Sequence, residues 1–195
     1  NNLKKFGGIF RRSELLGEID DINDAVLNSR ASINLQQRFV PNLLQSTSYK
    51  VYFPVELATS PTAFVVTSST FIFNDKVCFI RNALNDTKLQ IINSLGDVEI
   101  DNIGSYEPLT GTVNLTGFAP TAITAGTNYV KITATPANQS TIRPLRSYIL
   151  DLDEGTSYAT SVVDRQRTEI TLGGASGVTS SATGAANTYV RSPSI

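Results

Sequence analysis

Short β-forming segments separated by turn signals are the feature that most constrains this chain. Residues 70–73 and 77–80 are rich in Phe, Ile and Val, and Asn74-Asp75-Lys76 between them favours a tight hairpin. Strands of this length without intervening long helices predict an α+β fold, mainly antiparallel β with short strands and hairpins, and argue against a doubly wound α/β fold. The predicted strands are residues 33–39, 49–53, 63–66, 70–73, 77–80, 88–92, 97–100, 103–115 (with a turn at 109–111), 129–135, 147–152 and 158–163.

One helix is predicted, near the N-terminus. Ser13 stands where an N-cap would stand, and acidic residues follow it in the first turns, where they suit the positive end of a helix. Apolar residues recur at spacings of three and four, which places them on one face. We therefore expect a helix over residues 13–28, with a break near Asn23 as the alternative. The apolar residues of this face are Leu15, Leu16, Ile19, Ile22 and Val26.

Composition divides the chain into three regions. Residues 1–30 form an N-terminal arm and helix, residues 31–163 form a β-rich domain, and residues 164–195 form a flexible tail rich in Gly, Ser and Thr. Two small subdomains within the β-rich part, with a boundary near 58–62 or 117–128, remain an alternative. The chain begins with Asn1 rather than Met, and we expect it to be a fragment of a longer protein.

The composition excludes several classes of function. The 195 residues include 16 Lys+Arg, 17 Asp+Glu and no His, which gives a net charge of −1 and removes imidazole chemistry. Near-neutral charge argues against a nucleic-acid partner, and no apolar run is long enough to span a bilayer. Cys78, the single cysteine, cannot form an intrachain disulfide and is expected to be buried. We expect a soluble structural or binding protein with no cofactor and no small-molecule substrate.

Carboxylates provide the only clusters that resemble a catalytic site. Asp97, Glu99 and Asp101 alternate along a predicted strand and would share one face, while residues 151–154 include three acids after another strand. Paired carboxylates can perform acid–base catalysis or bind Ca²⁺. The favoured interpretation is a solvated sheet face, and a carboxylate hydrolase is the weaker alternative.

Three segments resemble a known protein family. Residues 9–29 (IFRRSELLGEIDDINDAVLNS), residues 103–115 with Ile103-Gly104, an aromatic residue and Thr110-Gly111-Thr112-Val113, and residues 142–150 (IRPLRSYIL) occur in this order. Together they resemble the C-terminal part of the baseplate wedge protein of contractile-tailed bacteriophages. This subunit builds the inner baseplate ring and is distantly related to the baseplate J-like proteins.

The resemblance implies a structural, non-enzymatic role in the virion, after assembly in the host cytoplasm. Copies of such a protein pair, close into a ring around the tail hub, and bind other wedge subunits, and the ring rearranges when the sheath contracts. A ring requires two distinct self-interfaces on each chain. A carbohydrate- or receptor-binding β domain of a tail fibre is the alternative function.

The predicted interface residues fall in four places. One contact is expected from the arm and the helix face, a second from exposed hairpins, a third from a basic pair, and a fourth from a tail strand that adds to a neighbour's sheet. The alternative for the helix face is that it packs in the core of the chain, as apolar helix faces more often do. In this order they are Phe6, Ile9, Phe10, Arg11, Arg12, Leu15 and Ile19; Tyr106 and Phe118; Arg143 and Arg146; and Tyr189.

Overall fold

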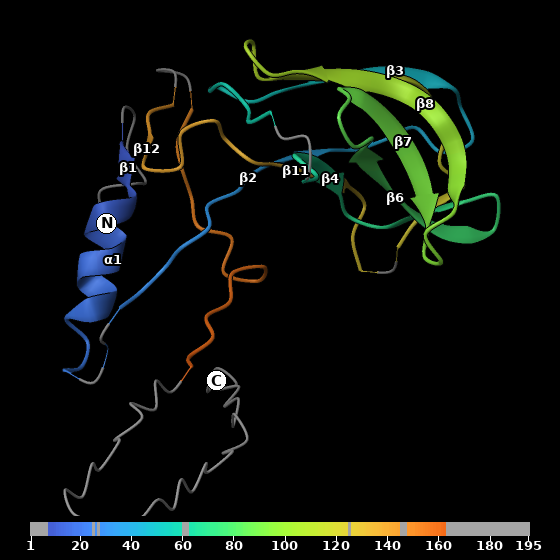
Figure 1. Cartoon of the computed structure of the whole chain (residues 1–195). Helices are drawn as coiled ribbons and strands as arrows, with labels where there is room; N and C mark the ends of the chain where they lie inside the picture. The colour runs from blue at the N-terminus through green and yellow to red at the C-terminus, as the bar shows by residue number, and fades with distance from the viewer. Residues whose placement is uncertain are drawn as a thin grey trace, which may run out of the picture. The chain divides into compact units, whose positions relative to one another are not determined.

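The computed structural model describes residues 8–24, 26, 28–59, 63–124, 126–144 and 148–162. The chain divides into two compact units, residues 1–151 and 152–195. Within the described residues the fold is mostly antiparallel β with one helix, which confirms the predicted fold class (Figure 1). The elements are β1 (Phe10–Arg11), α1 (Arg12–Asp20), β2 (Leu35–Phe39), β3 (Thr47–Tyr52), β4 (Val66–Ser68), β5 (Phe71–Phe73), β6 (Lys76–Asn82), β7 (Lys88–Asn93), β8 (Val98–Glu107), β9 (Thr112–Phe118), β10 (Ala122–Ile123), β11 (Val130–Ala134) and β12 (Thr141–Ile142).

Ten of the strands form one antiparallel sheet. Its main path runs β2-β11-β4-β6-β7-β8-β9-β3, and β5 pairs with β6 and β10 beside this path. The two end strands, β2 and β3, approach each other through the rings of Phe39 and Tyr49, whose centroids are 4.8 Å apart. The sheet therefore curls on itself, and Figure 1 shows the curvature of β3, β8, β7 and β6.

One hydrophobic core fills the inside of this curled sheet. Strands β3 to β9 and β11 each contribute buried apolar side chains, as the alternation of a half-buried strand requires, and β10 contributes the partly buried Ile123. Phe71 packs edge-on against Phe118 at 5.0 Å, and Tyr49 and Phe39 pack around the same ring. Cys78 is buried in this core, as predicted, and burial raises the pKa of its thiol.

The predicted hairpins are present because their turns are specified locally. Asn74 and Asp75 join β5 to β6 with φ values of 49° and 60°, the left-handed pair that a two-residue hairpin turn requires. Gly96, with φ of 96°, lies in the turn between β7 and β8. Gly111, with φ of 66°, precedes β9 and accepts a hydrogen bond from the Phe53 N–H at 2.8 Å.

The helix is shorter than predicted. It spans Arg12–Asp20 instead of residues 13–28, and Arg11, which makes no side-chain capping bond, occupies the N-cap in place of Ser13. Its last turn holds no basic residue, and Asp20 and Asp21 lie at the end that the helix dipole makes unfavourable for carboxylates. Ile22, expected on the apolar face, lies beyond the helix and is exposed.

Two predicted strands, at residues 147–152 and 158–163, are not found among the described residues. Within residues 148–162 the backbone is irregular, and a turn at residues 153–157 closes through hydrogen bonds from Thr156 N and Ser157 N to the Asp153 carbonyl. Tyr158 and Val162 are exposed, so this segment lacks the buried face that stabilises a strand. The predicted tail at 164–195 lies outside the described residues, and the boundaries at 30/31 and 163/164 stay predictions.

Candidate functional site

The strand pair β1–β12 brings together predicted interface residues that lie far apart in the sequence. Phe10 pairs with Ile142 and Arg11 with Thr141, and the Arg12 N–H donates to the Ser140 carbonyl at 2.9 Å. Arg143 follows β12 directly, so it joins the residues of the arm. We call β1, α1 and β12 the arm junction. The buried Ile142 completes it, but a two-residue strand leaves no periodicity from which β12 could be predicted.

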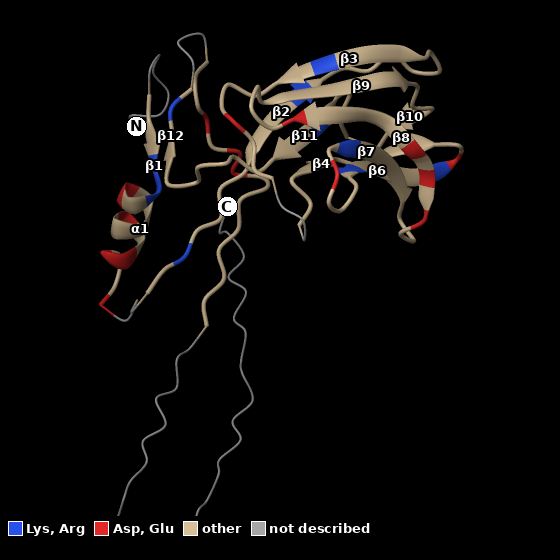
Figure 2. Cartoon of the chain, turned by 45° about the horizontal axis from the view of Figure 1, so that its top comes forward, with Lys and Arg blue, Asp and Glu red and all other residues tan. Residues whose placement is uncertain are grey.

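The apolar side chains of the helix in the arm junction are half-buried rather than fully buried. No side chain of α1 is buried, although Leu15, Leu16 and Ile19 all belong to it. Because side chains three and four residues apart share a face, Leu15 and Ile19 form a stripe along the helix. Glu14 and Glu18 flank this stripe, and Glu14 lies 3.8 Å from the Arg11 guanidinium. Figure 2 shows the acidic residues along α1.

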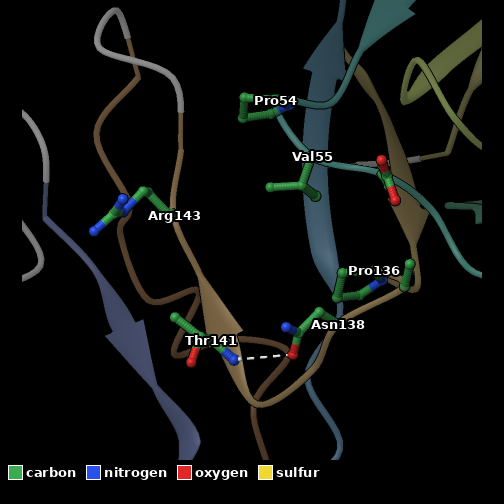
Figure 3. Close-up of a pocket in the computed structure, with 8 residues that line it drawn as sticks. Pro54, Val55, Pro136, Asn138, Thr141 and Arg143 are labelled. Carbon is green, nitrogen blue, oxygen red and sulfur yellow. Dashed lines mark hydrogen bonds between the residues drawn. The ribbon is translucent and has the colours of Figure 1, made fainter.

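A shallow groove lies where the loop after β3 meets the segment that leads to β12. The Ala137 N–H donates to the Glu56 carbonyl at 2.9 Å, and Leu57 and Pro136 form an isolated bridge, so the two walls are joined. Figure 3 shows Pro54 and Val55 on one side of the groove and Arg143 on the other. Its volume is about 280 Å³, and Glu56, Pro136, Ala137, Asn138 and Thr141 complete the lining.

Asn138 fixes the floor of this groove. Its side-chain oxygen accepts hydrogen bonds from Ser140 N at 2.9 Å and Thr141 N at 3.2 Å, the second of which is drawn in Figure 3. The bend that results directs the chain into β12. Of the charged groups that line the groove, Glu56 and Arg143 are both exposed and carry opposite charges. This arrangement can bind a short polar or extended segment.

The alternating carboxylates form ion pairs on the surface of the sheet. The Lys76 Nζ lies 2.7 Å from a Glu99 oxygen, and the Lys88 Nζ lies 2.7 Å from an Asp101 oxygen. Asn93 orders the turn between them and donates to both Glu99 and Asp97.

These ion pairs argue against acid–base catalysis by the alternating carboxylates. The Lys76 hydrogen bond, and then that of Asn93, holds the pKa of Glu99 below its ordinary value, and Lys88 and Gln90 do the same for Asp101. Both carboxyls are therefore ionised at neutral pH, whereas a general acid needs a raised pKa. Within the described residues no group of three or more acidic or thiol side chains is arranged to hold a metal ion. Among the described residues, no helix combines the length and the apolar character needed to cross a bilayer.

Two residues predicted at an exposed surface belong to the core. Tyr106 is 3% exposed and Phe118 is 0% exposed, so neither side chain is available to a partner. The cause is a change of side-chain alternation at two glycines, Gly104 (φ 146°) and Gly117 (φ 70°), where the ladders shift register. Across each glycine the next inward residue comes three positions later instead of two. Of the other predicted residues, Ile9 is half-buried, and Phe6, Arg146 and Tyr189 lie outside the described residues.

No protein-family model, curated protein or solved structure matches this chain.

Proposed function

We propose that this chain is a structural component of the baseplate wedge of a contractile-tailed bacteriophage. In this role it binds copies of itself, other wedge subunits and the tail hub, and it catalyses no reaction. The proposed role involves no cofactor, nucleic acid, membrane or small-molecule substrate. It rests on the resemblance of residues 9–29, 103–115 and 142–150 to that family, and on one structural observation.

The observation that carries the proposal is the incompletely buried apolar side of α1. Leu15 and Ile19 lie on one face, and both side chains are only half-buried in the single chain. A nine-residue helix is too short to be stable in water by itself, so packing on another surface would stabilise it. The β1–β12 pairing ties the start of this helix to the rest of the chain, and the half-buried stripe keeps part of its apolar surface accessible to a partner. An assembly protein needs a surface of this kind.

Substitution of the stripe tests the proposal. Leu15→Gln/Ile19→Gln removes the apolar surface but keeps good helix-forming residues. We expect sedimentation velocity on the full chain to show concentration-dependent oligomers for the unchanged protein and a dissociation constant at least about tenfold weaker for the variant. Leu95→Gln/Leu109→Gln is the control, because it makes the same kind of change at two apolar residues in turns, which are more exposed than Leu15 and Ile19. A chain that stays monomeric at all concentrations, or a Leu15/Ile19 variant that assembles like the control, would contradict the proposal.

A further inference from the structure

A row of polar side chains crosses the outer face of adjacent strands in the main sheet. Thr67 on β4 lies directly opposite Thr133 on β11 and Arg81 on β6 in the strand register. Each of the three alternates with core residues of its own strand, so the three side chains point away from the core. Figure 1 shows β11, β4 and β6 side by side. Gln36 on β2, opposite Thr133, and Gln90 on β7, opposite Arg81, extend the row at its ends. We call these five residues the polar row.

Arg81 is a cation to which the described part of the chain supplies no anion. Its guanidinium lies 4.5 Å from the centre of the Phe64 ring, and its Nε is buried without a hydrogen-bond partner. No carboxylate among the described residues forms an ion pair with it. Asp101, which bonds to Gln90 at the end of the row, also accepts a hydrogen bond from Lys88 Nζ at 2.7 Å. The terminal nitrogens of a half-buried guanidinium, held against an aromatic ring, therefore remain for a ligand.

The charge and the neighbours of this guanidinium indicate the class of ligand. One uncompensated cation matches one negative charge, and a guanidinium binds a carboxylate through two parallel hydrogen bonds. The hydroxyls of Thr67 and Thr133 come next in the row, and neither bonds to another described residue. A threonine hydroxyl both donates and accepts, as the hydroxyls of a sugar do. Adjacent strands lie about 4.8 Å apart, so the row from Arg81 to Thr133 is about 10 Å long, enough for a short oligosaccharide.

Apolar surface borders the polar row. Phe64 is 40% exposed, and Phe79, two residues before Arg81 on the same outer face, is half-buried. A sugar ring carries apolar C–H groups between its hydroxyls, so it can use the aromatic and the polar surface together. An inorganic anion would use only the charge, and an acidic peptide side chain would leave the threonine hydroxyls without partners.

We propose that the polar row binds an acidic saccharide, a chain of sugars that carry carboxylates. The terminal nitrogens of Arg81 bind a carboxylate, Thr67 and Thr133 hydrogen-bond to sugar hydroxyls, and Phe64 and Phe79 contact the C–H groups. The saccharide is bound and not converted. This inference goes beyond the proposed function and does not depend on it, because the polar row shares no residue with the arm junction.

Titration of the full chain with a trimer of galacturonic acid tests the proposal. Calorimetry measures the dissociation constant, and amide chemical shifts show which residues respond. The methyl ester of the same trimer keeps the sugar rings without the charge, and a capped peptide of three glutamates keeps the carboxylates without the sugar. We expect the acidic trimer to bind at least about tenfold more tightly than either, with the largest shifts at Thr67, Arg81 and Thr133.

Substitutions in the polar row separate its contributions. Arg81→Gln should weaken binding of the acidic trimer at least about tenfold, because it removes the charge-assisted hydrogen bonds. Arg81→Lys keeps the charge without the planar fork, and Thr67→Val keeps the shape without the hydroxyl, so each should weaken binding at least about threefold. Arg30→Gln makes the same change as Arg81→Gln at an exposed arginine outside the row, and we expect unchanged binding. Urea unfolding shows that each variant is folded, and Thr67→Val still tests the site if Arg81→Gln is not.

Three results would overturn the inference: the methyl ester binds like the acidic trimer, the glutamate peptide binds as tightly as the trimer, or Arg81→Gln and Thr67→Val bind like Arg30→Gln. The second result would assign the row to a carboxylate of a protein partner. None of them bears on the proposed function, because self-association is measured without saccharide and should be the same for Arg81→Gln as for the unchanged chain.

Discussion

The buried side chain of Asn82 forms hydrogen bonds that link β4 to β6, two strands that share only one paired position in their ladder. Strands β4 and β6 pair at Thr67 and Arg81 alone. Beyond that pair, the Asn82 Oδ1 accepts hydrogen bonds from Val65 N at 2.7 Å and Val66 N at 3.0 Å, and its Nδ2 donates to the Ala83 carbonyl at 2.9 Å. Asn82, Val65 and Val66 are all buried, so water does not replace these bonds.

Asn82→Ala is therefore expected to destabilise the chain strongly. It leaves two buried N–H groups without an acceptor, and each such group costs about 1–3 kcal/mol. The free energy of unfolding should fall by about 2–6 kcal/mol, a large part of the roughly 5–15 kcal/mol that stabilises a typical domain. Urea unfolding measures the loss as a lower midpoint, provided the slope is unchanged. Asn114→Ala is the matched control, because the Asn114 amide donates only a long 3.5 Å bond to exposed Glu107, and we expect a change within about 0.5 kcal/mol.

Amide hydrogen exchange tests the cause as well as the size of this loss. If Asn82 acts as the acceptor for β4, the Val65 and Val66 amides should lose protection first in Asn82→Ala, before amides at the β7–β8 ladder. The reasoning would be refuted if Asn82→Ala were as stable as Asn114→Ala, or if the Val65 and Val66 amides kept their protection in Asn82→Ala.

Two further predictions concern backbone conformation and pH. Gly104→Ala should lower the free energy of unfolding by more than about 1 kcal/mol in urea unfolding, because φ is 146° and the added Cβ would fall on a backbone carbonyl of β9. Gly17→Ala, where open space receives the methyl group, should leave it equal or up to about 1 kcal/mol higher; equal losses in both variants would contradict this. Hydrogen bonds from Lys76 and Asn93 lower the pKa of Glu99, so its contribution to stability is present above about pH 4.3 and is lost as the pH falls through that range and below. Glu99→Gln should therefore flatten the acid side of the stability profile, and an unchanged slope between about pH 5 and 2 would count against it.

Local signals account for the parts of the fold that the sequence predicted. The β5–β6 turn needs left-handed residues, and Asn74-Asp75 supplies two residues that adopt that conformation readily. The ends of the two strands are then close, so their register follows from the turn. The β7–β8 and β8–β9 hairpins follow in the same way. The pairing of β2 with β11 joins residues 91 to 99 positions apart, and no local pattern specifies it.

The surface residues were harder to predict than the hairpins, because their exposure depends on strand register and on contacts between residues distant in sequence. Alternation alone places Tyr106 and Phe118 on the outside of their strands, and only the register shifts at Gly104 and Gly117 turn them inward. The spacing of Leu15 and Ile19 predicts an apolar helix face but does not say what covers it. The link between the arm and Arg143 depends on β12, which has only two residues.

Stability and assembly rest on different residues in this chain. Each strand of the main sheet path from β3 to β11 contributes side chains to the core, whereas none of α1 is buried. A substitution at Leu15 therefore removes no core contact, and the midpoint of urea unfolding should stay the same while the dissociation constant of the oligomer changes. Truncation of the buried Val113 side chain should do the opposite. The cavity that it leaves in the core should lower the free energy of unfolding by about 2–4 kcal/mol, and the dissociation constant of the oligomer should stay the same. If Leu15 variants lowered the unfolding midpoint of the dilute chain, the helix would pack on its own β domain, and its apolar stripe would stabilise the fold of the single chain rather than an assembly.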